Sequence, residues 1–350
     1  MHVHPRFLHF VVLLALAPLG LLAGADDFFS WGNVCTEQRD ARWSFTYGMV
    51  ADMNGDVTET TRPYYDAVGR SADNALAERY SLADFDIDSG YSLFGVQFDK
   101  HYRFFSFHGS LSLLDLSTST TAKRHYYLSV YDDIDYGGQT YDHLMIRDGQ
   151  PFDAEFFGGI LGLSFDFTPF TLSFAEWARI APFVDIGLMG IVGQYEIDAG
   201  NPVGTTVYQN PPVDFVVGGH AESLIGIGAP QVGFGGEFTL GWDDGLQWVN
   251  RVGFDFFAYD GDTDLLTSSK HRSKRADVTL TTLTWESTVL IPLESLRALS
   301  VGLRIQAMEF DGSITSDAKD TKTVIARRER FNKDIAFDMA TVLLTAGFTF

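Results

Sequence analysis

The sequence predicts an all-β protein, an antiparallel transmembrane β-barrel of ten strands, and two observations lead to this fold class. Apolar and polar residues alternate along most of the chain, which is the two-residue period of a strand whose faces meet different surroundings. Beyond residue 25, no apolar stretch reaches the roughly 20 residues of a membrane-spanning helix, because glycine, serine, threonine or a charge interrupts it. Such segments can cross a bilayer only as a closed barrel, which leaves no backbone group unpaired in lipid.

The composition suits a wall that is apolar outside and polar inside. The chain has 34 glycines and 14% aromatic residues, with a mean hydropathy of +0.00. Acidic residues number 46 against 25 lysines and arginines, and the resulting net charge of −21 argues against nucleic-acid binding. The single cysteine, Cys35, cannot form an intrachain disulfide. It is either a small buried apolar residue, which we favour, or a free thiol.

The first 25 residues have the form of a secretory signal peptide. Arg6 precedes an apolar run from Phe10 to Leu22, and Ala23-Gly24-Ala25 is a small-x-small cleavage site. We therefore expect residues 1–25 to be removed after export across the inner membrane. Residues 26–40 then form a periplasmic N-terminal segment, and residues 41–350 form the barrel with its long extracellular loops.

Apolar and polar residues alternate clearly in ten segments. In each segment the odd-numbered and even-numbered positions face opposite sides, and we take the parity (odd or even) with the more apolar residues to face lipid. In the first, Trp43, Phe45 and Tyr47 face outward, whereas Ser44 and Thr46 face inward. The ten segments are 43–49, 94–98, 105–113, 157–167, 184–192, 232–242, 248–256, 283–291, 299–305 and 340–350.

The last six residues, Thr345–Phe350, carry a glycine at position 347 and two aromatic residues two positions apart, of which Phe350 is the last. This ending resembles the signal by which bacterial outer-membrane β-barrels are recognised for insertion. The resemblance implies a porin-like barrel in the outer membrane of a Gram-negative bacterium, although no specific family is matched. It also implies that Phe350 contacts the barrel-assembly machinery, and that lipid and lipopolysaccharide surround the wall. The C-terminus then lies in the periplasm.

Connection lengths agree with this orientation, because outer-membrane barrels have short periplasmic turns and long outer loops. Counting back from Phe350 places outside the connections 311–334, 259–276, 197–230, 116–154 and 53–88. The inner connections are 292–296, 243–245, 168–180 and 99–101. Within the long connection 168–180, residues 173–179 fit a short interfacial helix. A twelve-stranded barrel stays open as an alternative if residues 217–227 and 124–131 both cross the membrane, with a tight return at 228–230.

Charged residues at inward positions are candidates for the lumen. Eight-stranded barrels are filled by their own side chains, whereas barrels of sixteen or more strands hold an aqueous channel. For ten strands we expect a plugged or very narrow lumen with a salt-bridged filling, and a charge-selective constriction is the alternative. The candidate lumen charges are Asp185, Glu237, Arg251, Asp255, Glu286 and Arg304.

These features favour a porin-like protein for passive passage of small solutes or for envelope maintenance. The alternative is a non-conducting structural or adhesive barrel that acts through its loops. Two basic loops, 270–275 and 319–333, would then meet lipopolysaccharide phosphates or steer anions. The acidic runs 132–135 and 260–264 lack the full spacing of an EF-hand loop, so no metal site is predicted. No cofactor is predicted, and the oligomeric state is left open.

No residue qualifies as catalytic, so we expect no enzyme. A rim hydrolase, either a lipid hydrolase or one like the ten-stranded outer-membrane proteases (omptins), is the least favoured function. The sequence contains neither Gly-x-Ser-x-Gly nor His-Glu-x-x-His. Acidic and histidine side chains that such an activity would use are Asp132, Asp133, Asp142, His143, His220 and Glu222.

Overall fold

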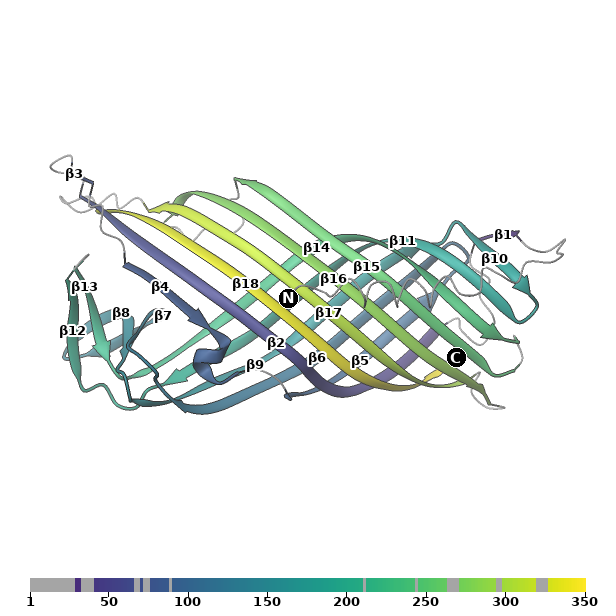
Figure 1. Ribbon diagram of the computed structural model, residues 1–350, viewed down its shortest axis with the longest axis horizontal. Helices are drawn as coiled ribbons and strands as arrows, with labels where there is room; N and C mark the ends of the chain where they lie inside the picture. Colours follow the sequence, from purple (N-terminus) through teal and green to yellow (C-terminus); the bar gives the residue numbers. More distant parts are fainter. Residues whose placement is uncertain are drawn as a thin grey trace.

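The computed structural model describes residues 29–32, 41–65, 70–71, 76–87, 90–209, 212–242, 245–262, 271–293, 298–318 and 327–350. Ten antiparallel strands form a ring, seen as a long tilted barrel in Figure 1. Pairing of β18 with β2 and of β9 with β11 closes the ring. In ring order the strands are β2 (Ala41–Tyr65), β5 (Ser92–His101), β6 (Phe105–Thr121), β9 (Pro151–Phe167), β11 (Ala178–Asp198), β14 (His220–Gly241), β15 (Gln247–Asp262), β16 (His271–Pro292), β17 (Ala298–Ala318) and β18 (Arg327–Thr349).

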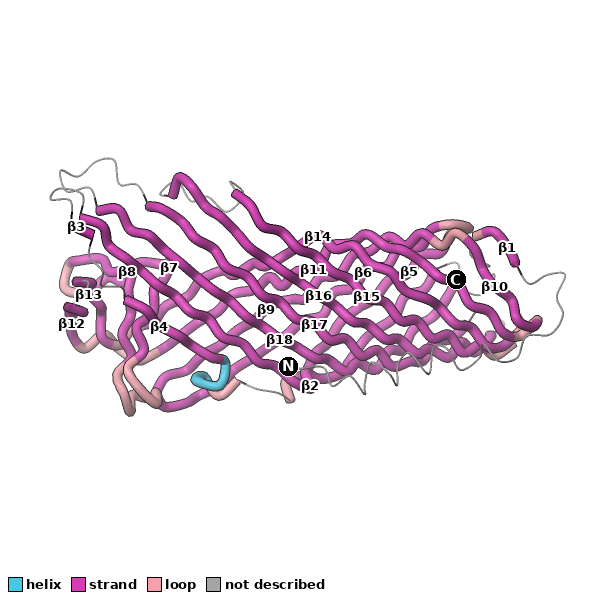
Figure 2. Tube along the Cα trace, turned by 45° about the horizontal axis from the view of Figure 1, so that its top comes forward, coloured by secondary structure: helices cyan, strands magenta, loops and turns pink. Residues whose placement is uncertain are grey.

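Shorter elements lie at the two ends of the barrel, and Figure 2 shows that strands dominate the described chain. We call the end that carries β1 and the C-terminus the turn end, and the end that carries β7, β8, β12 and β13 the loop end. The shorter elements are β1 (Phe29–Trp31), β3 (Arg70–Ser71), β4 (Leu76–Ser81), the 3-10 helix η3 (Leu82–Phe85), β7 (Tyr126–Tyr136), β8 (Gln139–Ile146), β10 (Phe170–Ala175), β12 (Gly204–Gln209) and β13 (Pro212–Val217).

Side chains of the ring strands alternate in exposure as the sequence predicts. On β2, Trp43, Phe45 and Tyr47 are exposed, whereas Ser44 and Thr46 are buried. Exposed apolar side chains continue around the wall, among them Phe94, Leu111, Leu113, Phe157, Leu161, Val184, Ile186, Leu188, Val192, Val232, Phe234, Val301 and Leu344. A surface of this kind is stable in lipid and not in water, so the ring is a transmembrane β-barrel.

The segment 215–231 does not supply a separate membrane strand. Its residues from His220 onward belong to β14, which pairs with β11 from His220 to Leu240 with no return at 228–230. Pro230 is paired with Leu188 of β11 but lies beyond the pairing with β15, which covers residues 232–241. Segment 124–131 likewise contributes to β7, which belongs to a separate four-stranded sheet. The barrel therefore has ten strands and not twelve.

The long turn-end connection predicted at 168–180 is in fact mostly strand. The interfacial helix expected at 173–179 is wrong, because β10 forms a hairpin with β11 and also pairs with β1. Phe170, Leu172 and Phe174 recur at every second residue, which is the period of a strand. Asp99 is also not in a turn, since β5 continues to His101.

At the loop end, the strands extend beyond the segments that alternate in sequence. β17 ends at Ala318 and β18 begins at Arg327, so much of the predicted loop 311–334 continues the ladder. Outside lipid both faces of a strand can meet water, and backbone pairing then requires no apolar alternation. The pattern in the sequence therefore fades before the strand ends.

The loop-end part of the lumen is filled by apolar side chains. Helix η3, cyan in Figure 2, adds Leu82 and Phe85 to this filling. Buried members of the cluster include Val50, Leu93, Leu114, Ile160, Met189, Leu280, Met308, Phe310, Met339 and Leu343. We call this set the apolar layer. The turn-end part of the lumen is charged instead, and the two halves of the interior therefore differ in chemistry.

Candidate functional site: a charged network across the lumen

Three side chains of the turn-end lumen lie side by side on consecutive strands. Arg42 on β2 is the register neighbour of Asp99 on β5, and Asp99 is the neighbour of His108 on β6. Arg42 donates from Nε to Asp99 Oδ2 at 2.8 Å, and His108 Nδ1 lies 2.7 Å from Asp99 Oδ1. Both carboxylate oxygens of Asp99 thus have a partner, which compensates for an exposed fraction of 0%.

A second row of charges crosses strands β14 to β17. Glu237, Arg251, Glu286 and Arg304 occupy directly opposed positions on these strands, so the sign alternates along the row. Opposite charges on cross-strand neighbours stabilise a sheet by about 0.2–1 kcal/mol per pair. Arg251 also lies over the ring of Phe183, with Cζ 3.8 Å from the centroid.

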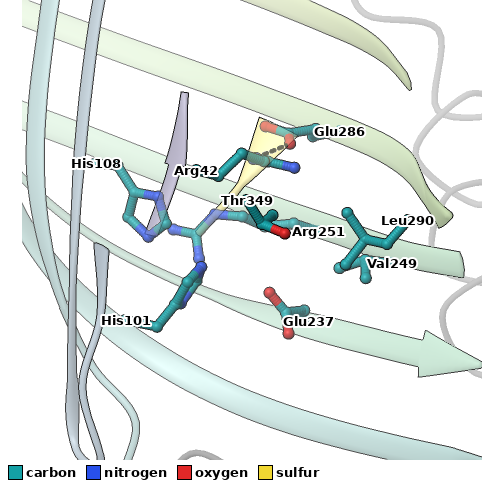
Figure 3. Close-up of a pocket in the computed structure, with 9 residues that line it drawn as sticks. All are labelled: Arg42, His101, His108, Glu237, Val249, Arg251, Glu286, Leu290 and Thr349. Atoms are coloured by element: carbon teal, nitrogen blue, oxygen red, sulfur yellow. Dashed lines mark hydrogen bonds and ion pairs between the residues drawn. The ribbon is translucent and has the colours of Figure 1, made fainter. Parts of the chain in front are cut away.

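Interactions across the lumen join the two rows. Arg42 donates from Nη2 to Glu286 Oε1 at 2.5 Å, drawn as the dashed line in Figure 3. On the other side, Asp166 Oδ2 lies 2.5 Å from Arg251 Nη1 and 3.0 Å from His108 Nε2. The result is a continuous chain of charged side chains, which we call the lumen network: Glu286, Arg42, Asp99, His108, Asp166 and Arg251.

Uncharged side chains satisfy further oxygens of the network. Gln97 donates from Nε2 to Asp99 Oδ1 at 3.2 Å and to Glu286 Oε2 at 3.1 Å, and so joins β5 to β16 across the lumen. Thr288 donates to Glu286 Oε1 at 3.1 Å. A buried charge is tolerated when it is both paired and hydrogen-bonded, and Glu286 meets both conditions.

His108 is held between two carboxylates. Each ring nitrogen faces a carboxylate oxygen, that of Asp99 or that of Asp166. Ionised carboxylates only accept hydrogen bonds, so the form of His108 that satisfies both contacts is the imidazolium. Beside the network is a cavity of about 20 Å³, lined in part by His101 and Glu237, as Figure 3 shows. That volume holds one or two water molecules.

A third row of lumen positions differs from the other two because it contains no cation. Asp166, Asp185, Gly233 and Asp255 are register neighbours on β9, β11, β14 and β15. Asp166 belongs to the lumen network. The other two aspartates flank Gly233, where an added Cβ would collide with Oδ1 of both. This row borders a cavity of about 90 Å³.

The sequence-predicted lumen charges all line these cavities. The structure brings Arg251 and Glu286 into the lumen network and places Glu237 and Arg304 beside them in register. Asp185 and Asp255 form a separate pair.

Sequence reasoning missed two members of the network. Arg42 immediately precedes the first alternating segment and shares the inward parity of Ser44, so extending that segment by one residue would have found it. Asp99 shares the inward parity of Gln97 but was assigned to a turn. His108 and Asp166 occupy inward positions of the predicted segments 105–113 and 157–167, but alternation does not indicate that they meet.

Residues considered for a rim hydrolase lie at the loop end. His143 on β8 packs against Phe215, with ring centroids 5.1 Å apart. His220 Nδ1 lies 3.4 Å from Glu196 Oε1, and with Glu222 these groups offer ligand atoms within 4.8 Å of one another. This outer cluster shares the lipid-facing parity of Val192, so it lies outside the lumen. Outside the described residues or side chains are the signal peptide, Cys35, Asp132, Asp133, Asp142 and the basic segments 270–274 and 319–333.

No protein-family model and no curated protein matches the sequence. Among solved structures, the beta domain of the Bordetella autotransporter Brka shares 9% identity, with 86% of this chain and 100% of that chain covered and a TM-score of 0.25. A Pseudomonas aeruginosa FadL homologue shares 8% identity over 89% and 90% of the two chains, with a TM-score of 0.19. The outer membrane channel DcaP of Acinetobacter baumannii shares 8% over 84% and 96%, with a TM-score of 0.16. Scores of this size support no inference about the site.

The class of the protein follows from its own strand pairing and surface. A closed antiparallel ring, an apolar outer wall and a charged lumen define a β-barrel protein of the outer-membrane type. Among the described residues, no helix has the length and hydropathy needed to cross a membrane.

Proposed function

We propose that this protein is a non-conducting outer-membrane barrel that supports its loop-end sheet at the cell surface. The observation that carries the proposal is the lumen network. Two of its ion pairs cross the lumen between strands that do not pair, β2 to β16 and β9 to β15, with contacts of 2.5 Å, and the network leaves a cavity of about 20 Å³ beside it. A space that holds one or two waters cannot pass a hydrated solute.

A second barrier lies nearer the loop end. The apolar layer fills the lumen there, and η3 packs on it through Leu82 and Phe85. Next to η3, Asp86 accepts a hydrogen bond from Lys123 at 2.8 Å, and Lys123 also donates to the carbonyl of Ala83 at 3.0 Å. A solute would have to displace this segment as well as break the network.

Planar-bilayer recording tests the proposal. We expect correctly folded protein to give no unitary conductance. Replacing Arg42 and Glu286 together by alanine removes the bridge across the lumen, and we expect this variant to conduct. The matched control is the exposed Arg275–Asp260 pair at the loop end, where Arg275 donates to both oxygens at 2.9 and 3.0 Å. Removing that pair should leave the bilayer silent. Regular conductance steps from the wild-type protein would refute the proposal.

Porin-like passage of small solutes is the second candidate, and the cavity of about 90 Å³ favours it. The wall of this cavity carries charges of both signs, among them Arg251, Arg304 and Asp185. In a narrow channel such charges select ions. This candidate requires conductance in the wild-type protein, changed when Arg251 or Arg304 is neutralised, so the same recordings separate the two functions.

The loop-end sheet is the part that the barrel would present. Strands β12, β13, β8 and β7 form it, and its buried Tyr126 and Val216 belong to the same apolar cluster as Phe152 and Ala221 of the wall. A short connection can replace the β12–β13 hairpin, because its ends are close together: Val203 donates its N–H to the carbonyl of Val217 at 2.9 Å. Replacing residues 203–217 by two glycines should preserve the barrel and abolish binding of outer-membrane vesicles to host or envelope components. Unchanged binding would exclude this sheet as the contact surface.

The proposal includes a location and an orientation. We place the turn end in the periplasm and the loop end outside, with lipid and lipopolysaccharide against the apolar wall. The assembly machinery, acting on Phe350, is the proposed partner during insertion. We assign the protein no enzymatic step. Turnover of peptide or lipid that is lost in His143→Ala or His220→Ala would contradict that assignment.

A further inference from the structure

We propose that Asp185 and Asp255 form a cation site in the lumen cavity, which takes a hard divalent cation of the Ca²⁺ type. Asp185 on β11 and Asp255 on β15 lie on either side of Gly233, which is on β14 between these two strands. Because glycine has no side chain, the Oδ1 atoms of both aspartates point into the space above it. Two carboxylates in one pocket repel each other unless a cation lies between them or they share a proton.

Asp185 supplies an independent observation that points to a ligand. Its exposed fraction is 8%, and its Oδ1 is buried without a hydrogen-bond partner in the described structure. A buried carboxylate oxygen with no partner is strongly unfavourable. The structure therefore has a buried acceptor that is aimed into the cavity and is not satisfied by the protein.

The other lumen acids show that this shortage of positive charge is local. Asp99 and Asp166 are each held by an arginine and by His108, and Glu286 is held by Arg42. Within the part of the chain that the structure describes, no lysine, arginine or histidine forms an ion pair with Asp185 or Asp255. Every acid of the network is thus in contact with a cation, whereas Arg251 and Arg304 line the same cavity as Asp185 and Asp255 without forming an ion pair with either.

The cavity offers further oxygen ligands and enough room for a hydrated ion. Gln231, two residues from Gly233 on the same inward face, donates from Nε2 to Thr282 Oγ1 at 2.9 Å, which leaves its amide oxygen for the cavity. The volume of about 90 Å³ holds an ion together with several waters. Calcium accepts irregular sets of six to eight oxygens, waters included, whereas magnesium demands a nearly ideal octahedron. Two carboxylates, an amide and waters therefore suit calcium.

Binding of radioactive Ca²⁺ tests this site and does not depend on whether the barrel conducts. The protein is refolded in detergent with ⁴⁵Ca²⁺ at neutral pH, in high salt that screens its surface charges, and is then desalted. We expect one retained calcium per folded chain. Asp185→Asn and Asp255→Asn, which keep the side-chain shape, should each abolish retention.

The matched control is Glu222→Gln in the outer cluster, where His220 and Glu196 offer competing ligands. We expect this variant to retain calcium. The proposal is overturned if Glu222→Gln loses its calcium. It is also overturned if both aspartate variants retain as much calcium as the wild type. A wild-type protein with no bound calcium overturns it too, since the pair then shares a proton instead. If neither aspartate variant folds, Gln231→Leu replaces them in the test, because it removes the amide ligand: weaker calcium retention supports the lumen site, and unchanged retention overturns it.

Discussion

Removing Arg42 should destabilise the barrel strongly, because this side chain neutralises two buried carboxylates. Asp99 has an exposed fraction of 0% and Glu286 of 7%. Breaking a buried ion pair by removing one partner costs about 3–5 kcal/mol, since the other charge stays buried. His108 still compensates Asp99, whereas Glu286 keeps hydrogen bonds from the neutral donors Gln97 and Thr288 only. Its register neighbours Arg251 and Arg304 form no ion pair with it and screen it from a distance. We therefore expect Arg42→Met, which keeps most of the volume, to lower the free energy of unfolding by about 3 kcal/mol.

The measurement is equilibrium unfolding in urea of the barrel inserted in lipid vesicles, followed by tryptophan fluorescence and extrapolated linearly to water. A second variant, Arg42→Met with Glu286→Gln, removes the stranded charge as well. Because the two residues are in contact, their effects should not add, and we expect the double variant to recover more than about 1 kcal/mol relative to the single one.

Two results would refute this reasoning. A loss below about 1 kcal/mol in Arg42→Met would mean that water in the lumen already screens Glu286, as it does at exposed ion pairs. A double variant as unstable as the sum of its single changes would mean that the network is not a coupled unit. Either result would remove the main support for a lumen closed by ion pairs.

Three further predictions concern the wall, the network and the loop end. Ile186→Lys places a charge on the outer wall, at a side chain with an exposed fraction of 63%, and should cost about 2–4 kcal/mol in vesicle unfolding; an unchanged free energy would show that this face does not meet lipid. His108→Gln should cost about 1–3 kcal/mol in the same assay, because one of two buried carboxylates loses its donor, and no loss would contradict the bridging role. The hydrogen bond from Lys123 lowers the pKa of the Asp86 carboxyl, so this contact holds above the usual carboxyl pKa and is lost as the pH falls through the lowered value. Protection of the amides at 82–87, taken relative to their intrinsic exchange rates, should then fall in acid and, in Lys123→Gln, already be low at neutral pH; identical protection in both proteins would contradict it.

The barrel wall is predictable from the sequence because lipid imposes one chemistry on one face. Trp43, Phe45 and Tyr47 must face hydrocarbon, and their inward neighbours must not, so the period appears in the residues themselves. Where the wall leaves lipid this demand ends. The strand ends near Ala318 and Arg327 are invisible in the sequence for that reason. The tight return at 228–230, on which the twelve-stranded alternative depended, does not form. Pairing of β14 with β11 outweighs the local turn preference of these residues.

The lumen was harder to predict, because inward parity gives position but not partner. Arg42 and Glu286 lie on β2 and β16, with β17 and β18 between them, and they meet only because an arginine is long enough to cross the lumen. Alternation in the sequence predicts that Asp185 and Asp255 face inward. It does not predict that they converge, which depends on the register that puts Gly233 between them. Neither strand order nor alternation contains this information.

A comparison of the two halves of the lumen indicates the role of the charged side chains. Space inside a ten-stranded ring can be filled by apolar side chains, and the loop-end half is filled in that way by Leu93, Met189 and Met308 among others. Buried ion pairs contribute little net stability relative to apolar residues of similar volume. Filling and stability therefore do not explain why the turn-end half is charged. Cross-lumen bonding through Arg42 and cation binding at Asp185 and Asp255 are roles that apolar residues cannot perform, and both follow from the positions these side chains occupy.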